Sequence, residues 1–181
     1  IADAMNQLYL MLLLAVIFIY LVMVAQFQSL LSPFIIMFTI PLAFTGGFLG
    51  LLITGFDVSV VALLGFVMLC GIIVNNGIVL VDYINKLRID GKERIESIVE
   101  AGKTRMRPIL ITALTTVLGL VVMALGIGTG AEMMQPIAIV CIGGLLYATF
   151  MTLYIVPVIY DLFNKKELKK VSDEDLEFID E

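Results

Sequence analysis

The sequence contains no histidine and only two cysteines, and charged residues make up just 15% of its 181 positions. Without histidine, histidine-based catalysis and the most common metal ligand are both excluded. Two cysteines do not make a disulfide scaffold, and a chain in which 61% of the residues are apolar does not stay disordered. A soluble domain is about half apolar and about one-quarter charged, so this composition indicates a membrane protein.

Charged residues are absent from four long stretches, which are separated by Asp57, by the segment 82–107 and by Glu132. A bilayer core of about 30 Å requires a helix of about 20 residues, so three stretches hold one helix each and the first is long enough for two. Ser32-Pro33 divides the first stretch, because the residue before a proline disfavours helix. We therefore predict an all-α polytopic membrane protein with five transmembrane helices, at about 6–26, 33–54, 58–82, 108–127 and 135–161.

Two basic clusters predict the orientation of the chain. Lysine and arginine are concentrated in the segment 82–107 and again at 165–170. Short basic segments stay on the cytoplasmic side, and one orientation places both there, with the N-terminus outside and the C-terminus inside. Residues 1–163 would then form the membrane bundle and 164–181 a charged cytoplasmic tail. A short amphipathic helix at about 86–106 would lie on the cytoplasmic membrane surface.

An outside N-terminus needs a translocation signal, and no such pattern precedes the first predicted helix. We therefore expect Ile1 to follow a larger exported region of the same protein. Cys70 and Cys141 fall in the middle of predicted helices, where they are interpreted as small apolar residues. The motifs of zinc hydrolases, P-loop enzymes and serine hydrolases are missing, so we expect no enzyme, no metal, no cofactor and no nucleic-acid partner.

The most informative residues are polar ones inside the predicted membrane helices. Asn75 and Asn76 lie near the middle of the third helix, where an unpaired amide is costly. Asn75 and Asp82 lie on one face of that helix, whereas Asn76 is turned by about 100°. Two interpretations stay open, namely hydrogen bonds that fix helix packing and part of an ion or proton pathway.

The fourth predicted helix carries a face of hydroxyl groups. Thr112, Thr115 and Thr116 are spaced three and four residues apart, and Arg105 precedes Thr112 by two turns. The alternative to a functional stripe is that each threonine only bonds the carbonyl of the preceding turn of its own helix. Pro108 is typical of a first helical turn.

Small residues predict where helices approach each other closely. Gly46 and Gly50 make a GxxxG pattern in the second helix, and Gly143 and Gly144 lie in the fifth. Small residues at such spacing let helix backbones come into contact. Pro41 is expected to kink the second helix.

Several motifs together resemble one transporter family. The runs GIIVNNGIVLVDY at 71–83 and RMRPILITALTT at 105–116 are similar to the resistance–nodulation–division efflux pumps, as are 25–47 and 143–160. The resemblance covers about residues 5–163 and implies spans eight to twelve of a twelve-span subunit. It implies a proton-driven antiporter of the plasma (inner) membrane, a homotrimer completed by the N-terminal half of the same chain. A periplasmic adaptor and an outer-membrane channel are possible further partners.

The resemblance also implies roles for individual residues. In the family, two aspartates of the other half of the transporter join a lysine, a threonine and an arginine in a proton relay. By motif position, the relay and its neighbouring asparagine fall on Asn75, Asn76, Arg105 and Thr112, with Asp82, Thr115 and Thr116 as secondary candidates. Asn75 stands where the family has lysine, and an amide cannot carry that charge. The implied role of Asn75 is therefore that of a hydrogen-bond partner of a carboxylate.

The substrate is predicted from the same positions. The metal-exporting branch of the family typically has an acidic residue near Asn75, and the methionines of this chain are scattered. The pattern therefore favours the branch that exports hydrophobic and amphiphilic compounds. Other interpretations stay open. The chain could belong to a relative in the same superfamily, either an accessory subunit of protein export or a lipid exporter, or it could be a non-transporting, sensor-type helix bundle.

Overall fold

The computed structural model describes residues 2–128 and 130–163, and every regular element in these ranges is a helix. The elements are α1 (Ala2–Phe27), α2 (Leu31–Met37), α3 (Thr39–Thr54), α4 (Val60–Ile89), α5 (Arg94–Ala124), a short 3₁₀ helix η1 (Ala131–Met134) and α6 (Gln135–Phe163). Five stretches are long and apolar enough to cross a membrane, with α2 and α3 sharing one and η1 and α6 another. The predicted all-α, five-span membrane fold is confirmed.

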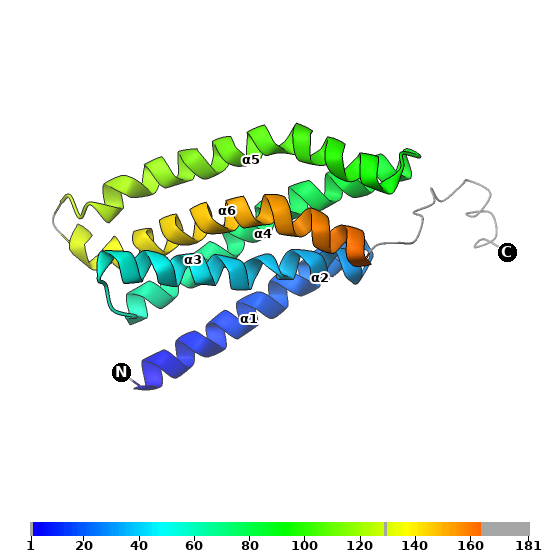
Figure 1. The fold of residues 1–181 in the computed structure, drawn as a ribbon. Helices are drawn as coiled ribbons and strands as arrows, with labels where there is room; N and C mark the ends of the chain where they lie inside the picture. Colours follow the sequence, from blue (N-terminus) through cyan, green and yellow to red (C-terminus); the bar gives the residue numbers. More distant parts are fainter. Residues whose placement is uncertain (1, 129, 164–181) are drawn as a thin grey trace.

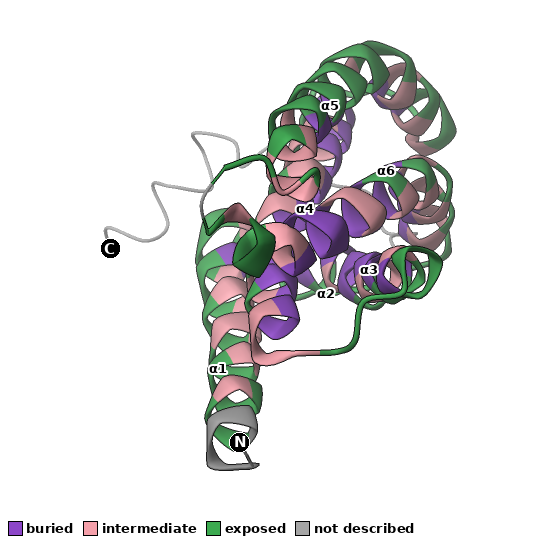
Figure 2. Ribbon diagram, turned by 90° about the vertical axis from the view of Figure 1, so that its left-hand side faces the viewer, coloured by how far each residue is buried: buried purple, intermediate pink, exposed green. Residues whose placement is uncertain are grey.

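The centre of the bundle is formed by α3, α4 and α6. α3 packs along α6, α4 lies against both, and α1 and α5 flank the bundle on different sides (Figure 1). Buried residues are concentrated where α3, α4 and α6 meet (Figure 2). α1 instead exposes large apolar side chains such as Phe18 and Val22, which suits a helix surrounded by lipid or by other membrane helices.

One span is interrupted at Phe38, between α2 and α3. Pro41 has no backbone N–H with which to bond the carbonyl of Met37, and its ring crowds that carbonyl. The hydroxyl of Thr39 donates to the carbonyl of Ile36 at 2.7 Å, which satisfies one carbonyl at the interruption. The irregularity expected from Pro41 is thus present and lies about one turn before the proline.

α5 is longer than the sequence predicts. A separate amphipathic helix and a span that begins at Pro108 are expected, but Arg94–Ala124 is one continuous helix with Pro108 in its interior. The residues before the proline are mostly good helix formers, so the helix begins earlier and passes through it. α4 likewise continues past Asp82 to Ile89. Where the bilayer lies along these helices stays a prediction, and the predicted tail at 164–181 lies outside the described residues.

Small residues bring the backbones of α3 and α6 together. A Cβ atom added to Gly46 would lie 2.7 Å from the carbonyl oxygen of Gly143, and one added to Gly143 would lie 2.7 Å from the carbonyl oxygen of Gly46. A Cβ on Gly50 would lie 3.4 Å from the Cα of Gly143, and one on Gly144 would lie 2.9 Å from the carbonyl oxygen of Ala43. These four glycines therefore lie where two helices approach too closely for larger side chains.

Candidate functional site

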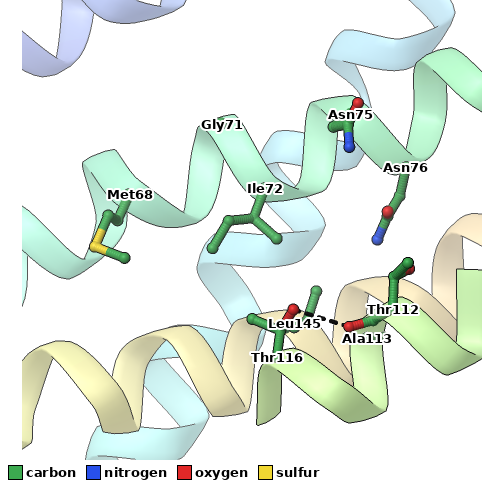
Figure 3. A pocket seen from close by; sticks show the side chains of 9 residues that line it. All are labelled: Met68, Gly71, Ile72, Asn75, Asn76, Thr112, Ala113, Thr116 and Leu145. Carbon is green, nitrogen blue, oxygen red and sulfur yellow. Dashed lines mark hydrogen bonds between the residues drawn. The ribbon is translucent and has the colours of Figure 1, made fainter. Parts of the chain in front are cut away.

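A pocket of about 460 Å³, lined by apolar side chains and by four polar ones, lies between α4, α5 and α6. Asn76 extends from α4 toward the face of α5 that carries Thr112 and Thr116 (Figure 3). The residues that line the pocket are Met68, Gly71, Ile72, Asn75, Asn76, Thr112, Ala113, Thr116 and Leu145. The pocket therefore brings the polar stripe of the third span and that of the fourth span together, around a space large enough for water or for a side chain from elsewhere.

The two asparagine amides are the groups of this pocket that lack partners. Within residues 6–128 and 130–163, neither Asn75 nor Asn76 makes a hydrogen bond. Both side chains line the pocket, although they leave α4 about 100° apart. Each amide offers two N–H donors and one carbonyl acceptor. Inside a membrane, an amide without a hydrogen-bond partner raises the free energy of the protein unless water or another helix bonds to it. The pocket therefore has room and hydrogen-bonding groups for a polar partner.

The threonine hydroxyls of α5 donate to their own helix. Thr112 Oγ1 donates to the carbonyl of Pro108 at 3.1 Å, and Thr116 Oγ1 donates to the carbonyl of Thr112 at 2.8 Å. Thr115 Oγ1 donates in the same way to Ile111 at 2.8 Å. Their oxygens can still accept a hydrogen bond. Only Thr112 and Thr116 line the pocket, whereas Thr115 is exposed outside it.

Arg105 and Asp82 do not line the pocket. The guanidinium carbon of Arg105 lies 4.5 Å from the centroid of the Tyr83 ring, two helical turns away from Thr112. Asp82 is exposed on α4, next to Tyr83 in the chain. The sequence therefore predicts the asparagines and two threonines of the pocket, but Arg105 contacts an aromatic ring that the sequence does not single out.

Ion pairs connect the helix ends beyond the pocket. Lys92, in the turn between α4 and α5, pairs with Glu100, and this hydrogen bond raises the pKa of the Lys92 ammonium above its usual value. Arg94 Nε lies 2.8 Å from Asp161 Oδ1, which links the start of α5 to the end of α6.

A second polar cluster, not predicted from the sequence, joins α2, α4 and α6. Tyr160 is fully buried, and its hydroxyl donates to Asn85 Oδ1 and accepts a hydrogen bond from Arg88 Nη1 at 3.1 Å. Asn85 Nδ2 donates to Ser32 Oγ at 3.2 Å. Arg88 is buried and Asn85 half-buried. Both belong to a segment rich in charge, where polar residues are usually solvated, so the sequence gives no clear signal of this cluster.

Tyr160→Phe tests whether this cluster stabilises the bundle. We expect the substitution to lower the free energy of unfolding by about 1–3 kcal/mol, because it removes one acceptor of the Arg88 guanidinium and the donor to Asn85 Oδ1. Thermal unfolding of the purified protein in detergent measures the change. Tyr154→Phe, at a position of the same helix that is 72% exposed, is the control and should have no effect. Equal shifts for the two variants would contradict the assignment.

Five apolar spans, with a pocket that carries polar groups between three of the helices, indicate the membrane part of a transporter. The chain belongs to the AcrB/AcrD/AcrF family, whose sequence model matches residues 1–164. It is 39% identical over 176 residues to the swarming motility protein SwrC of Bacillus subtilis, a match that covers 97% of this chain and 17% of that protein. It is 40% identical over 166 residues to the cobalt-zinc-cadmium resistance protein CzcA of Cupriavidus metallidurans, covering 91% of this chain and 16% of that protein.

Solved structures show the same fold. Two crystal forms of a heavy metal efflux pump match with TM-scores of 0.79 and 0.75 and with 31% and 33% identity. The matches cover 91% and 90% of this chain and 16% of the pump in each case, so the chain spans about one-sixth of the length of these relatives. The resemblance to resistance–nodulation–division efflux transporters is confirmed. The branch for hydrophobic and amphiphilic compounds is not, because CzcA and the solved pump are named for metals.

Proposed function

We propose that this chain is the C-terminal membrane part of a proton-driven efflux transporter, and that the pocket between α4, α5 and α6 is the uncharged side of its proton-coupling site. The pocket itself carries the proposal. Two amides without partners among the described side chains face a helix that bears hydroxyl groups. The sequence has no charged residue between Asp57 and Asp82, so the coupling carboxylates would come from another part of the transporter.

In this proposal, coupling depends on hydrogen bonds and not on an ion pair. An ionised carboxylate only accepts hydrogen bonds, so it would attract the N–H groups of Asn75 and Asn76. A protonated carboxyl group also donates, and it would turn toward an amide carbonyl or toward the oxygen of Thr112. The two protonation states therefore favour different partners on α4 and α5, and this difference would shift the relative positions of the two helices.

For the substrate, we propose hydrophobic and amphiphilic compounds. The third span has no acidic residue beside Asn75 and Asn76, and the resemblance implies that the metal-exporting branch typically has one there, which supports this choice. Divalent metal ions are a second candidate, which the names of CzcA and of the heavy metal efflux pump favour. Under either candidate, substrate would be selected outside these helices.

We further propose that the transporter lies in the plasma (inner) membrane, with the start of α1 outside and the end of α6 in the cytoplasm. The basic residues at the end of α4 and in the first turns of α5 support this orientation, because short basic loops stay on the cytoplasmic side. A homotrimer that works with a periplasmic adaptor and an outer-membrane channel, where an outer membrane exists, is the assembly that the resemblance implies.

Thr112→Val compared with Thr115→Val tests the proposed site. Both hydroxyls donate to their own helix, but only Thr112 lines the pocket. In the complete transporter we expect Thr112→Val to lower the rate of proton-coupled export about tenfold, which corresponds to about 1.4 kcal/mol. Thr115→Val should leave the rate within about twofold. Export by vesicles with an imposed proton gradient measures both rates, and an equal loss in both variants would count against the pocket.

A further inference from the structure

We propose that Tyr83 is a positioning residue for the coupling pocket. Its ring holds Arg105, and this contact sets the distance between α4 and α5 across the pocket. The proposal rests on the proposed function of that pocket, but the contact itself is a matter of helix geometry. In this proposal Arg105 does not line the pocket but acts on it by binding the ring of Tyr83.

The Tyr83–Arg105 contact joins the same faces of α4 and α5 that meet at the pocket, two helical turns away from it. Asn76 and Tyr83 are seven residues apart on α4, and Arg105 and Thr112 are seven residues apart on α5, so each pair lies on one helix face. α4 and α5 are consecutive, contacting helices that run in opposite directions (Figure 1). The Tyr83–Arg105 contact therefore lies about 10 Å further along the bundle than the place where Asn76 faces Thr112.

At the pocket itself, a space of about 460 Å³ separates the polar faces of α4 and α5. Beside it, Ile109, Ala113 and Val117 of α5 are buried in the core. The ends of α5 are held by specific contacts. Gln135 Nε2 donates to the carbonyl of Ala124 at 3.0 Å at one end, and Arg94 pairs with Asp161 at the other.

Pro108 makes the position of the Arg105 contact important. It lies between Arg105 and Thr112 and has no N–H with which to bond the carbonyl of Thr104, so α5 bends more easily at this turn. Arg94 and Arg105 both precede this turn, and Arg94 lies about three helical turns further from it. The stack of Arg105 on Tyr83, at 4.5 Å, is one turn from the proline. Arg105 Nε is buried without a hydrogen-bond partner among the described residues, so the ring face is its main contact.

The experiment compares Tyr83→Leu with Tyr83→Phe in the complete transporter. Spin labels on Ile72→Cys and Thr116→Cys, which face each other across the pocket, report the distance between α4 and α5 in a background without other reactive cysteines. We expect Tyr83→Leu to broaden or shift the distance distribution and to lower export about tenfold. Tyr83→Phe keeps the ring and should leave both unchanged. Tyr154→Leu, at an exposed site of α6, controls for the loss of a tyrosine.

Arg105→Leu completes the test. If the two side chains act as one contact, the double variant Tyr83→Leu/Arg105→Leu changes the distance no more than either single variant. An unchanged distance in Tyr83→Leu, or fully additive effects, overturns the proposal. A changed distance together with normal export in Thr112→Val would leave the contact standing and would refute the proposed function of the pocket instead.

Discussion

Gly143→Val is expected to prevent the membrane bundle from accumulating in its folded form. A Cβ atom on Gly143 would lie 2.7 Å from the carbonyl oxygen of Gly46 and 3.0 Å from the Cα of Gly50. These are backbone atoms of a neighbouring helix, so the collision is relieved only when α3 and α6 separate. Overpacking of this kind costs about 1–3 kcal/mol, and the two further valine methyl groups increase the cost. Thermal unfolding in detergent and the yield of folded protein measure the loss.

Gly119→Val provides the matched control for this substitution. Gly119 lies inside α5, in its last two turns, and a Cβ atom there would meet nothing within 4 Å. The change in helix propensity is the same in both variants, so the difference between them isolates the contact of α3 with α6. If Gly119→Val lowers the unfolding temperature as much as Gly143→Val does, the helix contact is not the cause.

Asn75→Leu is expected to lower export by about 100-fold or more while the protein stays folded. Asn75 is exposed in the pocket and makes no hydrogen bond with the other described residues, so its loss leaves no internal partner unsatisfied. Leucine can neither donate to an ionised carboxylate nor accept from a protonated one. About 100-fold corresponds to about 2.7 kcal/mol, within the range for hydrogen bonds to charged groups. Asn75→Gln retains the amide and should keep most of the activity.

The same variants also distinguish the two candidate substrate classes. Export of a hydrophobic dye and export of a divalent cation are each measured in the unmodified transporter and in Asn75→Leu. The substrate class is the one that the unmodified transporter exports and that Asn75→Leu no longer exports. Normal proton-coupled export in Asn75→Leu would remove this amide from the coupling site.

Much of the fold could be predicted because charge is so unevenly distributed in the sequence. Stretches without charge report how many times the chain crosses the bilayer, and all five crossings were found in this way. Such stretches do not define where a helix ends, because a membrane helix can extend beyond the bilayer into the aqueous phase. α4 therefore extends past Asp82, and α5 begins at Arg94 and not at Pro108. Helix propensity before the proline outweighed its preference for a first turn.

The polar residues on each helix could be predicted, but the contacts between the helices could not. Positions along one helix follow from its period, which identified the faces of Asn75, Asn76, Thr112 and Thr116. The register between two helices does not follow from either sequence alone, so the contact of Arg105 with Tyr83 and the cluster around Tyr160 were missed. One signal was available for the first contact: the seven-residue step from Asn76 to Tyr83 matches the step from Arg105 to Thr112 in the opposite direction.

The backbone contact between Gly46, Gly50 and Gly143 also limits how the bundle can move. Helices that interlock at this distance cannot slide or rotate past one another without a collision, so α3 and α6 behave as one rigid body. α4 belongs to the same body, because the side chain of Leu69 fills the space beside Gly144. We therefore expect displacement at the pocket to involve α5, because the space of the pocket separates its polar face from α4. The glycines between α3 and α6 restrict movement there, whereas the space of the pocket leaves room for movement between α4 and α5.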